Sequence, residues 1–144
     1  MAKALNAAGN LALGQGDFTS SYSFHERSLS IWDKVGYKKG IAQSLNNLGS
    51  VLFEQADYVR ARSNHEASLV IARELNDKRM IASSLLNLGA IAFRQENYSQ
   101  ARLLFEESLA IRRELAGETS LAVVLMQGIV QKAHKRRKEG REQR

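Results

Sequence analysis

The sequence predicts an all-α protein, a right-handed α-solenoid of three antiparallel helical hairpins followed by a C-terminal capping helix. The first observation behind this prediction is an internal repeat, because residues 41–80 and 81–120 align without a gap and share about 19 identical positions of 40. The second is that apolar residues within a repeat recur every three or four positions, which is the spacing of an amphipathic helix. In the second repeat this set is Ile41, Leu45, Leu48 and Leu52. The third is the absence of proline, which fits helices joined by short connections.

A more divergent copy precedes these two repeats, and a partial copy follows them. Leu5 and Gly9 match Leu45 and Gly49 at an offset of 40 residues, and a fourth copy begins at Leu121 with room for one helix. We therefore expect one domain over 1–138, with repeats at about 2–40, 41–80 and 81–120, a capping helix at about 120–138 and a basic tail at 139–144. The residues expected to face the core from the capping helix are Leu121, Val124, Leu125, Gly128 and Ile129.

Each hairpin has an expected cap and an expected turn. The residue before each second helix has a side chain that can accept a hydrogen bond from an unpaired N–H of the first turn. These residues are Asp17, Asp57 and Asn97. Gly16 suits a left-handed helix end, whereas Ala56 and Glu96 replace it in the other copies, so we expect those two turns to be less relaxed.

One position in each repeat holds a ring. His25, His65 and Phe105 are one period apart, and the change from His to Phe favours helix packing over metal binding. Successive hairpins lie on the order of 10 Å apart, too far for both imidazoles to share one zinc. Gly49 and Ala61 are expected where the two helices of a hairpin approach closely.

The repeat resembles the tetratricopeptide repeat over about Ala2 to Leu115. The residues that match this family are Leu45, Leu48, Gly49, Phe53, Gln55, Asp57, Tyr58, Ala61 and Leu69. The family's usual unit of about 34 residues ends in a proline that is absent here, and each second helix is extended, as in "HEASLVIARELND". This longer form is similar to the 40-residue variant in kinesin light chains, spindle-orientation adaptors and the sensor arms of bacterial transcription regulators and cyclases.

The resemblance implies that the first helices of successive repeats line a concave groove that binds an extended peptide. The candidate peptide-binding residues are Asn6, Asn10, Asn46, Asn47, Ser50, Phe53, Asn87 and Phe93. An Asn side chain can bond a peptide backbone both as donor and as acceptor. Two alternatives stay open: Asn47 and Asn87 bridge helices within the stack, and the Phe stripe belongs to the core. The family's carboxylate clamp is matched here only at Asn10 and Asn47. The three positions that hold basic residues in the clamp hold Asn6, Ser83 and Asn87 in this sequence, which disfavours a chaperone co-factor role.

Catalysis is not expected. The sequence has no nucleophile-elbow, phosphate-loop, dinucleotide-binding or H-E-x-x-H motif, and no cysteine, so we expect no enzyme activity, no cofactor and no metal. No apolar run approaches the roughly 20 residues of a membrane helix. A cytoplasmic setting is the expectation.

The positive charge is concentrated at the C-terminus. Residues 132–144 hold seven Lys or Arg and two Glu, which is +5 of the net +6. Lys135, Arg136, Arg137 and Lys138 are candidates for an anionic surface or nucleic acid, although the tail has no aromatic residue to stack on bases, and a solvated helix end is the alternative.

The sequence therefore predicts a non-catalytic protein–protein interaction module that binds an extended peptide or partner protein, as part of a larger regulatory or scaffold protein. A homo-oligomer built through exposed solenoid ends is the second hypothesis.

Overall fold

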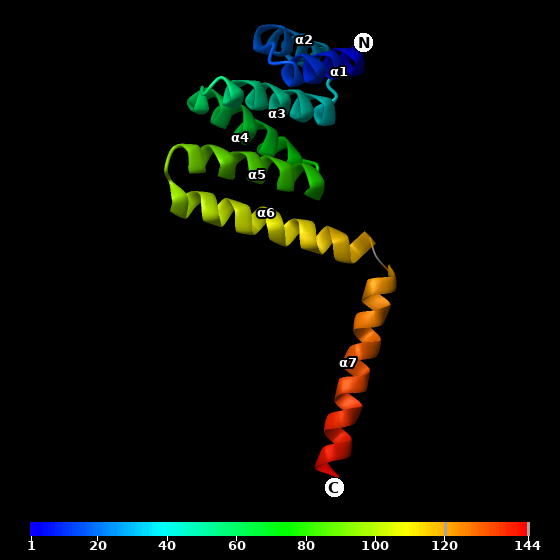
Figure 1. Cartoon of the computed structure of the whole chain (residues 1–144). Coiled ribbons are helices and arrows are strands. Elements are labelled where there is room, and N and C mark those ends of the chain that lie inside the picture. Colours follow the sequence, from blue (N-terminus) through cyan, green and yellow to red (C-terminus); the bar gives the residue numbers. More distant parts are fainter. Residues whose placement is uncertain (120, 144) are drawn as a thin grey trace.

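The computed structural model describes residues 1–119 and 121–143; side chains at 118, 119, 121–124, 126 and 127 lie outside the description. The described residues form helices and no strand. The helices are α1 (Ala2–Gly14), α2 (Phe18–Val35), α3 (Lys38–Glu54), α4 (Tyr58–Glu74), α5 (Lys78–Arg94), α6 (Tyr98–Thr119) and α7 (Leu121–Glu142). Figure 1 shows α1 to α6 as successive antiparallel hairpins stacked along one direction. The predicted all-α solenoid is confirmed.

The packing order follows the repeat. Each first helix packs against the second helix of its own hairpin, and successive hairpins meet where α2 contacts α3 and α4 contacts α5. The first helices α1, α3 and α5 also touch in sequence. The core lies between the hairpins, with Leu52, Ala61 and Ile91 buried at its centre. A single hairpin could not bury both of its apolar faces, so stacking creates the core.

The caps and turns agree with the sequence. Asp17, Asp57 and Asn97 accept hydrogen bonds from the backbone N–H three residues later, at 3.1, 3.2 and 3.4 Å. Gly16 has φ of 75°, and Ala56 and Glu96 have φ of 59° and 61°. The last two residues therefore adopt the left-handed backbone that glycine tolerates best.

The glycine of each first helix lies against the ring of the paired second helix. A Cβ built on Gly49 would lie 2.6 Å from His65 Nε2, and a Cβ on Gly89 would lie 2.6 Å from Phe105 Cε1. His65 is 1% exposed, so the ring fills this space completely. The position shared by His and Phe is a packing position, as expected, and the glycine makes room for the ring.

A row of buried serines ties the helices of each hairpin together. The Oγ atoms of Ser28, Ser68 and Ser108 donate to the carbonyl oxygens of Ala2, Ala42 and Ala82, at 3.0, 2.8 and 2.8 Å. All three serines are buried and lie 40 residues apart. Because the hydroxyl has a partner, a small polar residue is tolerated in the core at each period.

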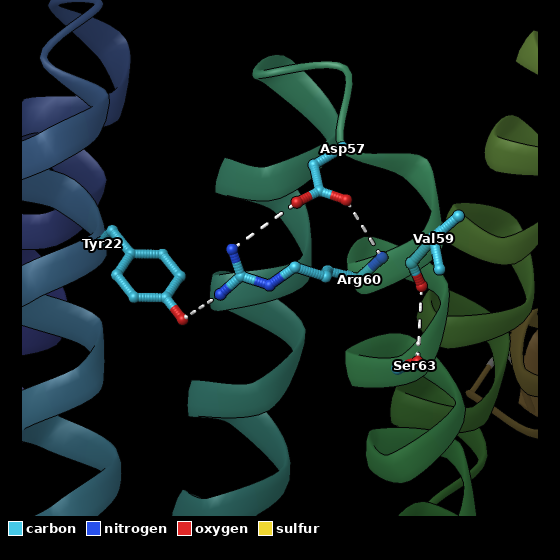
Figure 2. A network of polar contacts seen from close by, with 5 residues as sticks. All are labelled: Tyr22, Asp57, Val59, Arg60 and Ser63. Atoms are coloured by element: carbon cyan, nitrogen blue, oxygen red, sulfur yellow. Dashed lines mark hydrogen bonds and ion pairs between the residues drawn. The ribbon is translucent and has the colours of Figure 1, made fainter.

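The second helices of the first two repeats are joined at the surface by an arginine (Figure 2). Arg60 on α4 donates to the hydroxyl of Tyr22 on α2 at 3.0 Å, and its guanidinium lies 5.7 Å from the centre of that ring. The same guanidinium lies 3.5 Å from the carboxylate of Asp57. Below it, Ser63 donates to the carbonyl of Val59 at 3.3 Å. Of these contacts, the one between Arg60 and Tyr22 joins neighbouring hairpins at the surface, in addition to their apolar core.

The last helix departs from the expectation. α7 runs to Glu142, past 138, and points away from the stack (Figure 1). Within the part of the chain that the structure describes, it contacts α6 and no other helix. Leu125 and Ile129 are 59% and 68% exposed, so the expectation that they face the core is wrong, and α7 does not cover α6 as a cap. The side chains of Leu121 and Val124, expected to face inward with them, lie outside the described residues, and Gly128 is half-buried.

Two substitutions explain this departure. Arg112 on α6 is exposed at the position where the second repeat has the fully buried Ala72, and burying an unpaired guanidinium under a covering helix would be costly. Ala116 lies 40 residues after Asn76 and so occupies the equivalent position of the next repeat. Asn76 ends its helix in a left-handed turn with φ of 51°. At this position of the third repeat the chain stays helical, and α6 continues to Thr119.

Candidate functional site

The candidate site is a groove between α3 and α5, which we call the α3–α5 groove. A cavity of about 350 Å³ is lined by the N-terminal halves of both helices, through Lys39, Gln43, Asn46, Asp77, Arg79, Met80 and Ser83. A cavity of about 190 Å³ is lined by their C-terminal halves and one α4 residue, through Ser50, Phe53, Glu54, His65, Asn87 and Ala90. Because equivalent halves of the two helices meet in each cavity, α3 and α5 run parallel along the groove.

An amide bridge separates the two cavities. Asn87 Nδ2 on α5 donates to Asn46 Oδ1 on α3 at 3.1 Å, and the same oxygen lies 2.8 Å from His65 Nδ1. Burial lowers the pKa of His65 to about 4, so the ring is neutral near pH 7. When the neutral ring carries its proton on Nδ1, His65 is a second donor to Asn46 Oδ1 beside Asn87.

The first repeat contains the same pair in a simpler form. His25 Nδ1 lies 3.0 Å from Asn6 Oδ1, and burial lowers the pKa of His25. His25 Nε2 has no hydrogen-bond partner, which fits an unprotonated nitrogen in an apolar setting. The third repeat has Leu86 and Phe105 at these positions, so the polar pair is replaced there by two apolar side chains.

The structure brings some of the predicted peptide-binding residues together. Ser50, Phe53 and Asn87 line one cavity, and Asn46 lines the other. Ser50 Oγ donates to the Asn46 carbonyl at 3.1 Å. The helix-bridging role that the sequence left open for Asn87 is present, because its amide bonds Asn46 on the next helix.

The other predicted residues lie outside the two cavities. Asn6 contacts His25 within the first hairpin, Asn10 is exposed on α1, and Asn47 is half-buried on α3. Phe93 is 54% exposed, with its ring centre 5.3 Å from that of Tyr98.

Phe53 belongs to the core and to the cavity wall at once. It packs against the buried cluster around Leu52, and its ring centre lies 5.6 Å from that of Tyr58. The Arg94 guanidinium lies 5.6 Å from the same ring centre. One edge of a core aromatic is thus available to a ligand.

The predicted peptide-binding set lacked nine of the lining residues, which are Lys39, Gln43, Glu54, His65, Asp77, Arg79, Met80, Ser83 and Ala90. Ser83 lies four positions before Asn87, and Arg79 four before Ser83, so a helical spacing of four could have identified both. His65 was recognised as a packing residue, and its ring also reaches the cavity.

Other kinds of site find little support in the described part of the chain. No group of three His, Asp or Glu there could hold a metal ion. Across the same residues, no helix combines the length and hydropathy needed to cross a bilayer. The candidate anionic-surface residues Lys135, Arg136, Arg137 and Lys138 are exposed on α7.

The comparison with protein families identifies the class. The family model described as tetratricopeptide repeat matches residues 1–58 and 40–114, so the chain belongs to this family. A search of curated protein sequences gives no match.

Several solved structures share the fold. BtubC (BKLC) from P. vanneervenii has a TM-score of 0.73 at 21% identity, with 81% of this chain and 48% of that chain covered. The TPR domain of Arabidopsis FLU has a TM-score of 0.73 at 16% identity, with 79% and 95% covered. A Rap protein complexed with Competence and Sporulation Factor has a TM-score of 0.76 at 20% identity, with 93% and 40% covered. This chain thus spans less than half the length of BtubC and of the Rap protein.

Proposed function

We propose that the chain is a non-catalytic interaction module that binds an extended peptide segment of a partner protein in the α3–α5 groove. The observation that carries the proposal is the pair of cavities on either side of the Asn46–Asn87 bridge. Membership of the tetratricopeptide repeat family supports a protein partner. The Rap structure supports it as well, because that relative is complexed with Competence and Sporulation Factor.

The groove has the chemistry for an extended chain. Asn46 Oδ1 already accepts hydrogen bonds, whereas Asn46 Nδ2 and Asn87 Oδ1 make none within the described chain and remain for a ligand. A peptide backbone offers a carbonyl and an N–H in alternation, which suits this donor and acceptor. Phe53 and Ala90 give the second cavity an apolar wall for one ligand side chain.

The setting we propose is cytoplasmic, within a larger regulatory or scaffold protein. Its support is the complete absence of cysteine, which gives an oxidising compartment no advantage.

The proposal is tested by filling the cavity without removing a core contact. Ala90 is half-buried on α5 and lines the 190 Å³ cavity, so Ala90→Leu places a larger side chain where a ligand side chain would enter. The matched control is Ala110→Leu, at an exposed α6 position. Peptides selected from a phage-displayed random 12-residue library are labelled and titrated by fluorescence anisotropy. We expect Ala90→Leu to weaken binding by at least roughly tenfold, about 1.4 kcal/mol, and the control to have no effect.

Equal binding by Ala90→Leu and the wild type, with both variants folded by circular dichroism, would remove the groove as the site. A library that yields no binding peptide would count against peptide recognition as a whole.

A second candidate function is self-association through α7, favoured by its exposed apolar side chains. Leu125, Ile129 and Val130 are 59%, 68% and 65% exposed. Light scattering at two concentrations and two salt levels gives the particle mass, which is twice 16.1 kDa for a dimer. A dimer that Ile129→Glu dissociates supports this candidate, and a monomer under all conditions refutes it.

A further inference from the structure

A basic cavity adjoins the N-terminal end of the α3–α5 groove. It has a volume of about 440 Å³ and is lined by Arg79, Ala82, Ser83, Arg112, Leu115 and Ala116. Arg79 and Ser83 also line the 350 Å³ cavity of the groove. The two hollows therefore meet at these residues, with one arginine from α5 and another from α6.

The two arginines differ from the basic residues around them. Lys78 pairs with Glu114 at 3.2 Å, Arg73 with Glu107 at 3.6 Å, and Lys39 with Asp77 at 3.8 Å. Neither Arg79 nor Arg112 forms an ion pair with any residue that the structure describes.

Among the described residues, the two joined cavities are lined by three basic side chains and one acidic side chain, Lys39, Arg79, Arg112 and Asp77, so their net charge is +2. Guanidinium groups present several N–H donors in a planar fork that matches a carboxylate. The net positive charge of the two joined cavities therefore favours binding of an anionic group.

This cavity lies on the last of the three described hairpins, between α5 and α6. Ala72, one period before Arg112, is 0% exposed where α5 packs on α4, whereas Arg112 is exposed. At this period position the first two repeats have Trp32 and Ala72, so the exposed charge of Arg112 is found in the third repeat alone among the three.

We infer that this basic cavity binds an acidic side chain of the peptide held in the α3–α5 groove, with Arg79 and Arg112 as its charged partners and Ser83 between them. The inference rests on the proposed function, because it names the partner's chemistry for the same groove. Its anion is a side-chain carboxylate within the peptide.

The geometry also orients the ligand. Glu54 lines the far cavity beside Phe53 and Ala90, so that end repels an acid and favours an apolar side chain. Ser83 and Ala90 are seven residues apart on α5, which is roughly 10 Å of helix. An extended peptide covers this distance in about three residues. The recognised pattern is thus an acidic and an apolar residue about three positions apart.

The test uses the full chain and the phage-displayed 12-residue library. The most enriched peptide is made with a fluorophore and an amidated C-terminus, so that no terminal carboxylate can act as the anion. We expect enriched sequences to share the acidic–apolar spacing. The double variant Arg79→Glu with Arg112→Glu should bind this peptide with an affinity at least roughly tenfold lower than the wild type. The control Arg113→Glu, adjacent on α6 and outside the cavity lining, should leave the affinity unchanged.

A charge swap makes the test specific. Replacing the acidic residue of the peptide with Lys should abolish binding to the wild type and restore it to the doubly reversed variant. Because Arg79 and Arg112 are both exposed, their reversal is expected to leave the fold intact, which circular dichroism checks.

Two results would overturn the inference: enriched peptides without an acidic residue, or equal affinity for the wild type and the doubly reversed variant. If Ala90→Leu still abolishes binding in that case, the groove stands and only the acidic subsite fails. If neither change affects binding, the proposed function fails together with the inference.

Discussion

Replacing Gly49 with alanine is the most direct test of how the hairpins pack. The added Cβ would lie 2.6 Å from His65 Nε2 and 2.8 Å from Cδ2 and Cε1, inside van der Waals contact. The ring is 1% exposed and lies 2.8 Å from Asn46 Oδ1, so any shift of the ring away from the added Cβ would disturb this contact. Overpacking of this kind costs about 1–3 kcal/mol, and the better helix propensity of alanine returns about 1 kcal/mol.

The expected net change for Gly49→Ala is therefore a loss of about 1 kcal/mol in the free energy of unfolding, measured by urea denaturation with circular dichroism. The sign of this change in the free energy of unfolding should reverse when the His65 ring is absent. In a His65→Ala background the clash disappears, and Gly49→Ala should stabilise by about 1 kcal/mol, giving a coupling of about 2 kcal/mol between the two sites.

Gly14→Ala is the control, because a Cβ there meets no atom within 4 Å. If Gly49→Ala stabilised the protein as much as Gly14→Ala does, or if the sign were the same in both backgrounds, the packing argument would be refuted.

Three further predictions concern charge, backbone and hydrogen bonding. The pKa of His65 is about 4 in the folded state against 6.5 unfolded, so unfolding takes up a proton between these values. Stability should thus be complete above pH 6.5 and fall by about 3 kcal/mol towards pH 4, a slope that His65→Phe should reduce in urea titrations at several pH values. Ala56→Gly should raise the melting temperature by relieving a left-handed alanine, worth about 0.5–1 kcal/mol, whereas Gln55→Gly should lower it. Ser68→Ala should cost about 1 kcal/mol by removing its 2.8 Å bond to Ala42, and calorimetry showing no loss would contradict that role.

The periodic features of the fold could be predicted from the sequence because each has a local cause. The cap at Asp57 and the left-handed turn at Ala56 follow from short-range backbone chemistry. The 40-residue offset indicated that the same contacts recur, which is why the ring at His65 was recognised as packing. Short-range backbone rules and a constant repeat length are therefore enough to predict the helices and their order along the chain.

The path of α7 could not be predicted in this way. Leu125 continues the repeat register, so the pattern alone predicts an inward-facing residue, yet the side chain is 59% exposed. Whether a helix stacks depends on the surface it would cover, and Arg112 makes that surface costly to bury. The spacing of apolar residues within α7 does not reveal whether the neighbouring helix α6 offers a surface on which α7 can pack.

In the candidate site too, some residues recur in successive repeats and others occur in one repeat only. Asn46 and His65 repeat the pair formed by Asn6 and His25, so the amide row has a structural cause, and its presence alone does not indicate a ligand. Arg112, one of the two charged residues that we propose bind a ligand, departs from this periodicity. Arg112 replaces a buried alanine, remains without an acidic partner in the described chain, and borders a cavity that continues into the groove. Because Arg112 is exposed and forms no ion pair within the described chain, we infer that its charge contacts a partner.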